Sequence, residues 1–167
     1  MRLIFTCLTI GALSAPAAAD VLVRFQEGAP TDRFIFEATG SCPIEAARLT
    51  LDLSGSDAGL VFDVTAQGAG VEVFQPFTLV SGADLVTGTS GVTDGDQRLS
   101  LDVARLDPGA RIAFTIDIDD TLEGSQITVS GAEIAGAQAI LQMGAEVFAA
   151  PFRADATARI PLAACLS

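Results

Sequence analysis

The sequence contains no lysine, histidine, asparagine, tryptophan or tyrosine. Without histidine or lysine, a serine nucleophile has no ordinary general base and a zinc ion has no imidazole ligand. Without tryptophan or tyrosine, nucleobases lose their most common stacking platforms. A carboxylate pair could still hydrolyse a glycosidic bond, but among this many acidic residues some pair meets the required spacing by chance. These absences indicate a protein that acts by binding and is not an enzyme.

Acidic and apolar residues dominate what is present. The chain has 167 residues, of which 50% are apolar, and it carries 21 acidic against 9 basic side chains for a net charge of −12. Ten phenylalanines among many valines and leucines are enough to bury a core, so disorder is excluded. The negative charge repels phosphate backbones and anionic membrane surfaces, so we expect no nucleic-acid partner.

Residues 1–19 are typical of a signal peptide. Arg2 supplies the positive end, residues 3–13 an apolar core, and the alanines at 17–19 a small-residue cleavage site. The apolar run is shorter than the roughly 20 residues that span a bilayer, so we expect no membrane insertion. The expected products are a leader over residues 1–19 and a single exported domain over residues 20–167, located in the periplasm or outside the cell.

Cleavage of the leader removes Cys7 and leaves Cys42 and Cys165 in the domain. An even pair of cysteines in an exported domain predicts a disulfide bond. This bridge would close a loop of roughly 120 residues and stabilise the fold by about 4 to 5 kcal/mol on the chain-entropy model. The alternative is two separately buried thiols.

Hydrophobic residues alternate with polar ones along most of the chain. The clearest case is residues 112–119, where isoleucine and phenylalanine alternate with alanine, threonine and aspartate. The same period of two predicts strands at residues 21–25, 33–38, 49–54, 60–64, 77–80, 99–103, 126–134, 139–143, 147–152 and 156–160. Glycine, aspartate and proline between them favour tight turns, and residues 99–111 are typical of a hairpin turning at Asp107-Pro108-Gly109. The expected fold is all-β, an antiparallel, immunoglobulin-like β-sandwich of about 8 to 11 strands.

Five stretches of sequence together carry a resemblance to a known family. They are residues 27–34, 59–64, 70–77, 114–122 and 129–136. In this order they resemble the aggregation factor core proteins, small exported bacterial proteins similar to the core protein of the sponge aggregation factor. The resemblance implies a calcium-associated, extracellular adhesion module of β type.

Asp117, Asp119, Asp120 and Glu123 form the most suggestive polar group. Residues two apart on a strand share a face, so Asp117 and Asp119 are expected to point together toward solvent, with Asp120 at the turn. One interpretation, which we favour at this point, is an acidic strand edge that deters edge-to-edge pairing. The other is a partial calcium cage, since calcium takes about six to eight oxygen ligands.

Asp94 and Asp96 could complete such a site from another loop. They flank Gly95, however, and this pattern is also that of a tight turn, which is the interpretation we prefer.

Phe74 and Phe77 flank Gln75 and Pro76. Because Pro76 interrupts a strand, the segment is expected at a sheet edge or a bulge. Core packing is the first interpretation of the two rings, and an apolar contact for a partner or a sugar is the second.

The function expected from the sequence is that of an exported, non-enzymatic binding module in cell-surface adhesion or aggregation. Calcium is its candidate cofactor, and a protein or glycan at the cell surface its partner. The alternative is a periplasmic, chaperone-like module that binds a protein or a glycan.

Overall fold

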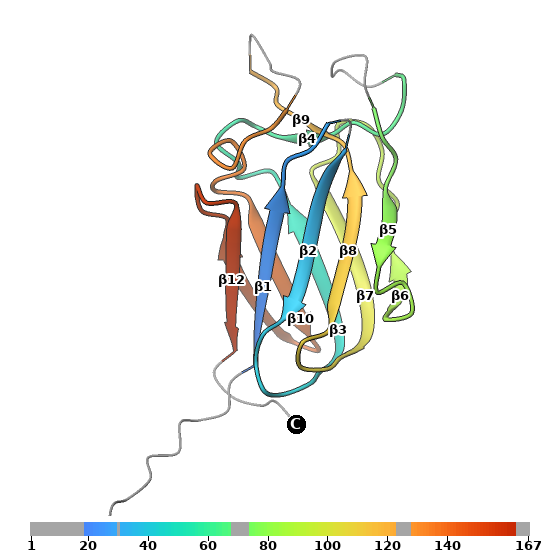
Figure 1. Ribbon diagram of the computed structural model, residues 1–167, viewed down its shortest axis with the longest axis vertical. Coiled ribbons are helices and arrows are strands. Elements are labelled where there is room, and N and C mark those ends of the chain that lie inside the picture. Colours follow the sequence, from blue (N-terminus) through green and yellow to red (C-terminus); the bar gives the residue numbers. More distant parts are fainter. Residues whose placement is uncertain (1–18, 30, 68–73, 123–127, 163–167) are drawn as a thin grey trace, which may run out of the picture.

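The computed structural model describes residues 19–29, 31–67, 74–122 and 128–162, and in these ranges the chain is all β. Two five-stranded antiparallel sheets face each other (Figure 1). The front sheet contains, in order, β12 (Thr157–Leu162), β1 (Ala19–Gln26), β2 (Asp32–Ala38), β8 (Arg111–Ile116) and β5 (Thr78–Ser81). The rear sheet contains β11 (Glu146–Pro151), β10 (Gln138–Met143), β3 (Ile44–Asp52), β7 (Arg98–Leu106) and β6 (Val86–Thr89).

A third, short pair of strands crosses one end of the two large sheets. It is formed by β4 (Val61–Phe62) and β9 (Ile118–Asp119), at the top of Figure 1. The large sheets confirm the predicted antiparallel β-sandwich, and this pair brings the described part of the chain to twelve strands.

The core lies between the inner faces of the two large sheets. Strand alternation turns Phe34 and Phe36 of β2 inward and Arg33 and Glu37 outward, as the sequence predicts. Phe34 stacks on Phe114 of β8 with ring centroids 5.4 Å apart. Facing them, the rear sheet buries Leu49, Leu51, Leu99, Leu101 and Leu141. Each such side chain stabilises the fold by about 1.5 to 3 kcal/mol, so the sandwich is held mainly by this layer.

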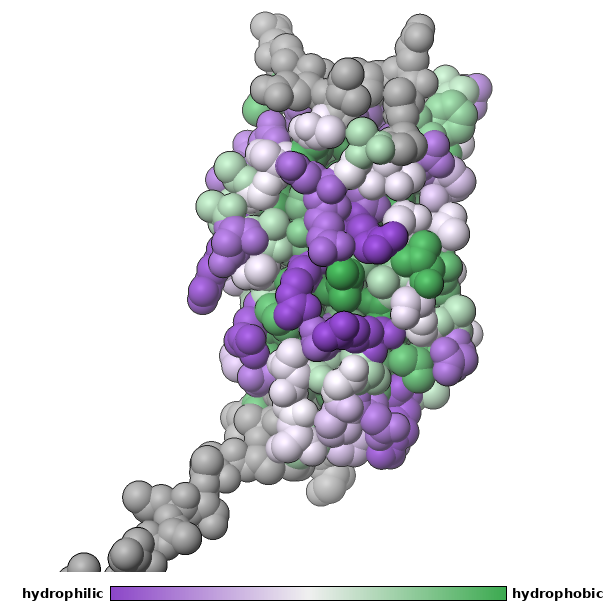
Figure 2. All heavy atoms as spheres, in the orientation of Figure 1, coloured by the Kyte–Doolittle hydropathy of each residue, from purple (hydrophilic) through white to green (hydrophobic). Residues whose placement is uncertain are grey.

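The outer face of the front sheet is mixed in character. Figure 2 shows hydrophilic residues crossing the middle of this face beside apolar patches. Among them, the carboxylate of Glu37 accepts hydrogen bonds from Arg24 on β1 and Arg111 on β8. These ion pairs link three adjacent strands of the sheet.

The predicted hairpin over residues 99–111 is wrong, although its turn is present. The backbone turns at Asp107, whose carbonyl accepts a hydrogen bond from the Ala110 amide. The Gly109 amide, however, donates to the Ala38 carbonyl at the end of β2, and the Ala38 amide donates to Ala110. These bonds draw β8 into the front sheet while β7 stays in the rear one, so the turn joins the two sheets.

The strand expected over residues 126–134 is also wrong for its described part, residues 128–134. The Glu133 and Ile134 amides both donate to the Ser130 carbonyl, and the Glu133 carboxylate accepts from the Ser130 amide and hydroxyl. The apolar residues Val129 and Ile134 are buried, but they anchor a turn and not a strand.

Candidate metal centre

Four buried aspartates occupy the end of the sandwich where β4 and β9 cross. Asp63 follows β4, Asp117 precedes β9, Asp119 ends β9, and Asp32 begins β2. We call these four residues the aspartate cluster. Since the register pairs Asp32 with Ile116, the start of β2 lies beside the end of β8, where the chain leaves the front sheet.

Backbone hydrogen bonds fix the segments at Asp63 and Asp117 against each other and against a third segment at Gln75. The Asp63 amide donates to the Asp117 carbonyl at 3.1 Å, and the Asp117 amide donates to the Gln75 carbonyl at 3.2 Å. The Gln75 amide donates to the Asp63 carbonyl at 3.3 Å, which closes the arrangement. The cluster is therefore built on paired backbone and not on the tip of a loop.

Three carboxylates of the cluster converge. One oxygen from each of Asp63, Asp117 and Asp119 lies within 4.8 Å of the other two, and these residues are 3%, 8% and 5% exposed. Ligands on opposite sides of a calcium ion lie about 4.6 to 5.2 Å apart, because calcium–oxygen distances are about 2.3 to 2.6 Å. The spacing of the three oxygens therefore fits a single calcium ion between them.

Burial makes the ionised form of these groups costly. It raises the pKa of Asp117 to about 7, and the negative charges of Asp119 and Asp63 act in the same direction. Burial likewise raises the pKa of Asp32 to about 8, although the hydrogen bond from the Gly28 amide opposes the change. Burial also raises the pKa of Asp63. Without a cation, part of the cluster is thus protonated near neutral pH.

Within the described residues, three members of the cluster have no arginine partner. None of the ion pairs in the described part of the chain includes Asp32, Asp63 or Asp117. In addition, the Oδ1 atom of the buried Asp63 has no hydrogen-bond partner. Since an unsatisfied buried acceptor costs about 1 to 3 kcal/mol, this oxygen is suited to a bound cation. Carboxylate oxygens alone favour a hard ion such as calcium over zinc or copper.

Asp94 supports the cluster from the connection between β6 and β7. Its Oδ1 accepts hydrogen bonds from the Val64 and Thr65 amides at 2.7 and 2.8 Å, and its other oxygen accepts from the Thr65 hydroxyl. These hydrogen bonds, that of the Thr65 hydroxyl first, lower the pKa of Asp94. Asp94 thus fixes the chain directly after Asp63. Asp96 accepts from the Thr93 amide and hydroxyl and stabilises the turn around Gly95 that the sequence indicates.

The sequence prediction for this site is partly wrong. Asp117 and Asp119 do come together, but they are buried and do not point toward solvent, because β8 and β9 belong to different sheets and the chain changes partners at Asp117. Asp120 is outside the converging group, and its carboxylate accepts a hydrogen bond from the Leu122 amide. Glu123 lies outside the described residues.

Sequence reasoning missed Asp63 and Asp32. Asp63 directly follows the apolar residues Leu60, Val61 and Phe62. Asp32 is the first residue of β2, two positions before Phe34. An aspartate at a strand end was the available signal, but only the fold shows which strand ends meet.

The two phenylalanines proposed for binding have different environments. Phe77 is half-buried and packs on Phe114 with ring centroids 5.1 Å apart. Phe74 is 37% exposed. The two rings therefore do not form one exposed patch.

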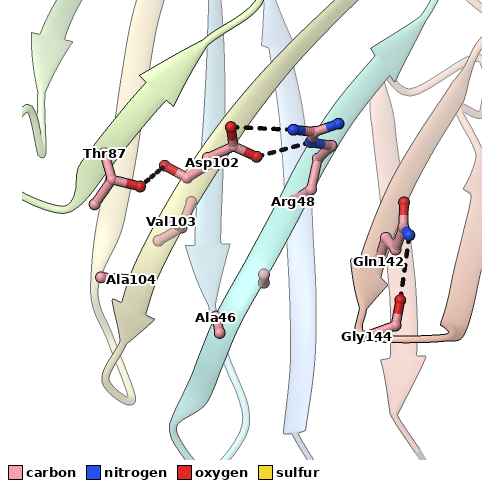
Figure 3. Close-up of a pocket in the computed structure, with 9 residues that line it drawn as sticks. Ala46, Arg48, Thr87, Asp102, Val103, Ala104, Gln142 and Gly144 are labelled. Carbon is pink, nitrogen blue, oxygen red and sulfur yellow. Dashed lines mark hydrogen bonds and ion pairs between the residues drawn. The ribbon is translucent and has the colours of Figure 1, made fainter.

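A shallow hollow of about 350 Å³ lies on the rear sheet (Figure 3). Arg48 of β3 and Asp102 of β7 face each other across it and form two hydrogen bonds, at 2.7 and 3.1 Å. Its floor includes small residues, among them Ala46, which has the unusual backbone angle φ of 47°. The hollow offers polar groups and open space to a ligand, but its charges already pair with each other.

No family model, curated protein or solved structure matches the chain. Within the described residues, no helix is long and apolar enough to cross a membrane. The assignment of function therefore depends on the chemistry of the aspartate cluster and on the sequence.

Proposed function

We propose that this chain is an exported, non-enzymatic binding module that acts in cell-surface adhesion or aggregation and binds calcium in the aspartate cluster. The observation that carries the proposal is the convergence of Asp63, Asp117 and Asp119 in a buried site where one oxygen of Asp63 lacks a partner. Buried carboxylates are ordinarily paired with a cation, and no arginine fills this role for Asp63 or Asp117 in the described part of the chain.

The site gives calcium a means to control binding. The converging carboxylates come from two of the three backbone segments that meet at Asp63, Gln75 and Asp117. An ion between these carboxylates would hold the Asp63 segment against the segment of Asp117 and Asp119. Without the ion, the mutual repulsion of the carboxylates opposes the same arrangement. The shape of this end of the sandwich would then depend on calcium, as expected for a calcium-associated adhesion module.

The first test measures thermal unfolding of the chelator-treated protein with and without calcium. Calcium at a hundred times its dissociation constant should stabilise the fold by about 2.7 kcal/mol. For a domain of this size the melting temperature should rise by about 5 to 10 °C. Magnesium should raise it less, because magnesium demands a stricter octahedral geometry.

Matched variants make this test specific. The double variant Asp117→Asn with Asp119→Asn should fold but lose the calcium shift, since both amides keep the shape and remove the charge. Asp84→Asn removes an exposed carboxylate from the turn between β5 and β6 and should keep the full shift. No shift in the wild-type protein at millimolar calcium would show that the cluster is not a calcium site.

The second test addresses adhesion itself. Beads coated with the protein should clump in calcium, disperse in chelator, and stay dispersed when coated with the double variant. A calcium shift without clumping would overturn the adhesion role and leave a calcium-binding domain with another partner.

The hollow on the rear sheet favours a second candidate function, a periplasmic, chaperone-like module that binds a protein or a glycan. A partner could rest on the small residues beside Arg48 and Asp102. Cell fractionation separates the two functions, because an adhesion module should be found at the cell surface and the periplasmic module in the shock fluid with a bound client.

Export and the Cys42–Cys165 disulfide belong to the same proposal. Cys42 is buried, Cys165 and residues 1–18 lie outside the described residues, and β1 begins at Ala19 beside the predicted cleavage site. The intact mass of the exported protein should correspond to a chain that begins at Asp20 and lacks two thiol hydrogens. A mass that retains both hydrogens would exclude the bond.

A further inference from the structure

Asp32 is buried beside the converging carboxylates but is not one of the three. It is the first residue of β2 and is 2% exposed. Its carboxylate accepts a hydrogen bond from the Gly28 amide at 3.2 Å and another from the Ile118 amide of β9. Asp32 therefore joins the connection between β1 and β2 to the strand that ends at Asp119.

The peptide unit between Asp117 and Ile118 is held on both sides. Its carbonyl accepts a hydrogen bond from the Asp63 amide at 3.1 Å, and its N–H donates to the Asp32 carboxylate. In a trans peptide these two groups point in opposite directions, so the two bonds together fix the rotation of the peptide. The same N–H also bonds the carboxylate of Asp117. The orientation of this peptide therefore sets the position of that carboxylate.

This peptide also influences how two of the converging carboxylates face the third. Asp117 and Asp119 flank Ile118, and one oxygen of each lies within 4.8 Å of an oxygen of Asp63. A rotation of the peptide would move the carboxylate of Asp117 and redirect the chain toward Asp119. Removing a group that orients metal ligands through hydrogen bonds typically lowers metal affinity by about 10- to 100-fold. Asp32 occupies the position of such a group.

Calcium and magnesium respond differently to the rigidity of a site. Calcium accepts irregular sets of about six to eight oxygens, whereas magnesium demands a near-ideal octahedron with ligands about 2.0 to 2.1 Å away. A peptide that is fixed on both sides limits the adjustment of Asp117 and Asp119 to the smaller ion. Loss of the Asp32 hydrogen bonds would permit this adjustment, so Asp32 affects the choice of ion as well as the strength of binding.

We propose that Asp32 is a positioning residue of the calcium site, which holds the peptide between Asp117 and Ile118 and thereby favours calcium over magnesium. This inference rests on the proposed calcium site, which is supported by the buried, unpartnered Oδ1 of Asp63. Because coupling between two sites is reciprocal, an ion among the three carboxylates should in turn stabilise the hydrogen bond between Gly28 and Asp32.

The first test is calorimetric titration of the chelator-treated wild-type protein and of two Asp32 variants, with calcium alone and with magnesium alone. Asp32→Ala removes both hydrogen bonds and should weaken calcium binding by about 10- to 100-fold, and magnesium binding by less. Asp32→Asn keeps an oxygen acceptor and should restore part of the calcium affinity. Losses that are equal for both ions and in both variants would show that Asp32 contributes only its charge, and the inference would be wrong.

Asp52→Asn is the matched control. Asp52 is also buried and also accepts a hydrogen bond from a backbone amide, that of Ser54 at 3.1 Å. This variant should destabilise the fold and leave both ion affinities unchanged. If the wild-type protein binds no calcium, the proposed function itself fails. If the wild-type protein binds calcium and Asp32→Ala binds it equally well, only the role of Asp32 fails.

A measurement on the wild-type protein decides the matter if Asp32→Ala does not fold, which circular dichroism would show. Amide hydrogen exchange, followed by nuclear magnetic resonance, should slow more at Gly28 than at Ser54 when calcium is added. Both amides donate to a buried aspartate, but only the partner of Gly28 also holds the peptide beside the ion. Equal slowing at the two amides would reflect overall stabilisation alone and would overturn the inference.

Discussion

The carboxylates on the sheet faces and those at the β4–β9 end of the molecule have opposite electrostatic environments. On the front sheet, hydrogen bonds from Arg24 and then Arg111 lower the pKa of Glu37. On the rear sheet, burial acts to raise the pKa of Asp52, but hydrogen bonds from Arg98 and Ser54 outweigh it and lower the pKa. In the aspartate cluster, burial raises the pKa of Asp32 to about 8 and that of Asp117 to about 7.

Burial alone does not explain this difference. Asp52 is 5% exposed and Asp117 is 8% exposed, so the two side chains are removed from water to a similar extent. What differs is the counter-charge, since Arg98 pairs with Asp52 at 2.6 Å and Asp117 has acidic neighbours. The comparison supports the proposal that Asp32, Asp63 and Asp117 take their counter-charge from solution, as protons without metal and as the proposed calcium ion with it.

The largest expected effect is the pH dependence of stability in the metal-free protein. Asp32 and Asp117 have folded-state pKa values of about 8 and about 7, above the ordinary value of 3.8 that applies when the chain is unfolded. Between the unfolded-state and folded-state pKa values, the folded protein binds more protons than the unfolded chain. The contribution of these two groups to stability is therefore most favourable below about pH 4 and falls as pH rises toward 8. Each group contributes at most about 1.4 kcal/mol per pH unit.

Melting temperatures in chelator at pH 5 and pH 8 measure this effect, and the value at pH 5 should be the higher. Saturating calcium should reduce the difference, because metal replaces the protons. The variant Asp32→Asn should also reduce it, since an amide does not titrate. A metal-free protein that is more stable at pH 8 than at pH 5 would contradict the contrast between the two regions.

The sequence predicts the sandwich well because both large sheets follow a period of two. The predicted strands 21–25 and 33–38 lie within β1 and β2. Every buried residue in these two ranges is apolar and sits at an alternate position. The strand β6 was missed, because its sequence Val-Thr-Gly-Thr has a glycine and little apolar character.

The site was harder to predict because it depends on contacts between distant segments. Asp63 and Asp117 are 54 positions apart in the sequence, and the fold brings them together through a backbone hydrogen bond. Asp117 also breaks the alternation, since Ile116, Asp117 and Ile118 are all buried where the chain changes sheets. Local periodicity could therefore identify Asp117 and Asp119 as neighbours but could not supply their partners.

A smaller effect is expected when a paired carboxylate is deprived of its arginine. Arg98→Ala should leave Asp52 buried without a cation and raise the pKa of that carboxyl. Loss of a fully buried pair costs about 3 to 5 kcal/mol, but the Arg98 side chain is 70% exposed and solvent screens the pair, so we expect about 2 kcal/mol. Chemical denaturation measures this loss.

The double variant Arg98→Ala with Asp52→Ser is the control for that experiment. Removing the buried charge as well should recover part of the lost stability. If the loss of stability in the double variant instead equals the sum of the losses in Arg98→Ala and Asp52→Ser measured separately, the two residues do not act as a pair.

The smallest effect is expected for the ion pair in the rear-sheet hollow. Arg48 and Asp102 form two hydrogen bonds, yet both side chains are about half exposed to water. Screening and the entropy of holding two side chains therefore offset most of their attraction. The variant Arg48→Ala should therefore melt within experimental error of the wild-type protein, in contrast to Arg98→Ala. Side-by-side melting curves of the two variants at low and high salt measure the contrast. A marked loss of stability in Arg48→Ala would show that an exposed ion pair stabilises the fold as much as a pair with a buried carboxylate. Burial and counter-charge together would then not explain the difference between the sheet faces and the end of the sandwich.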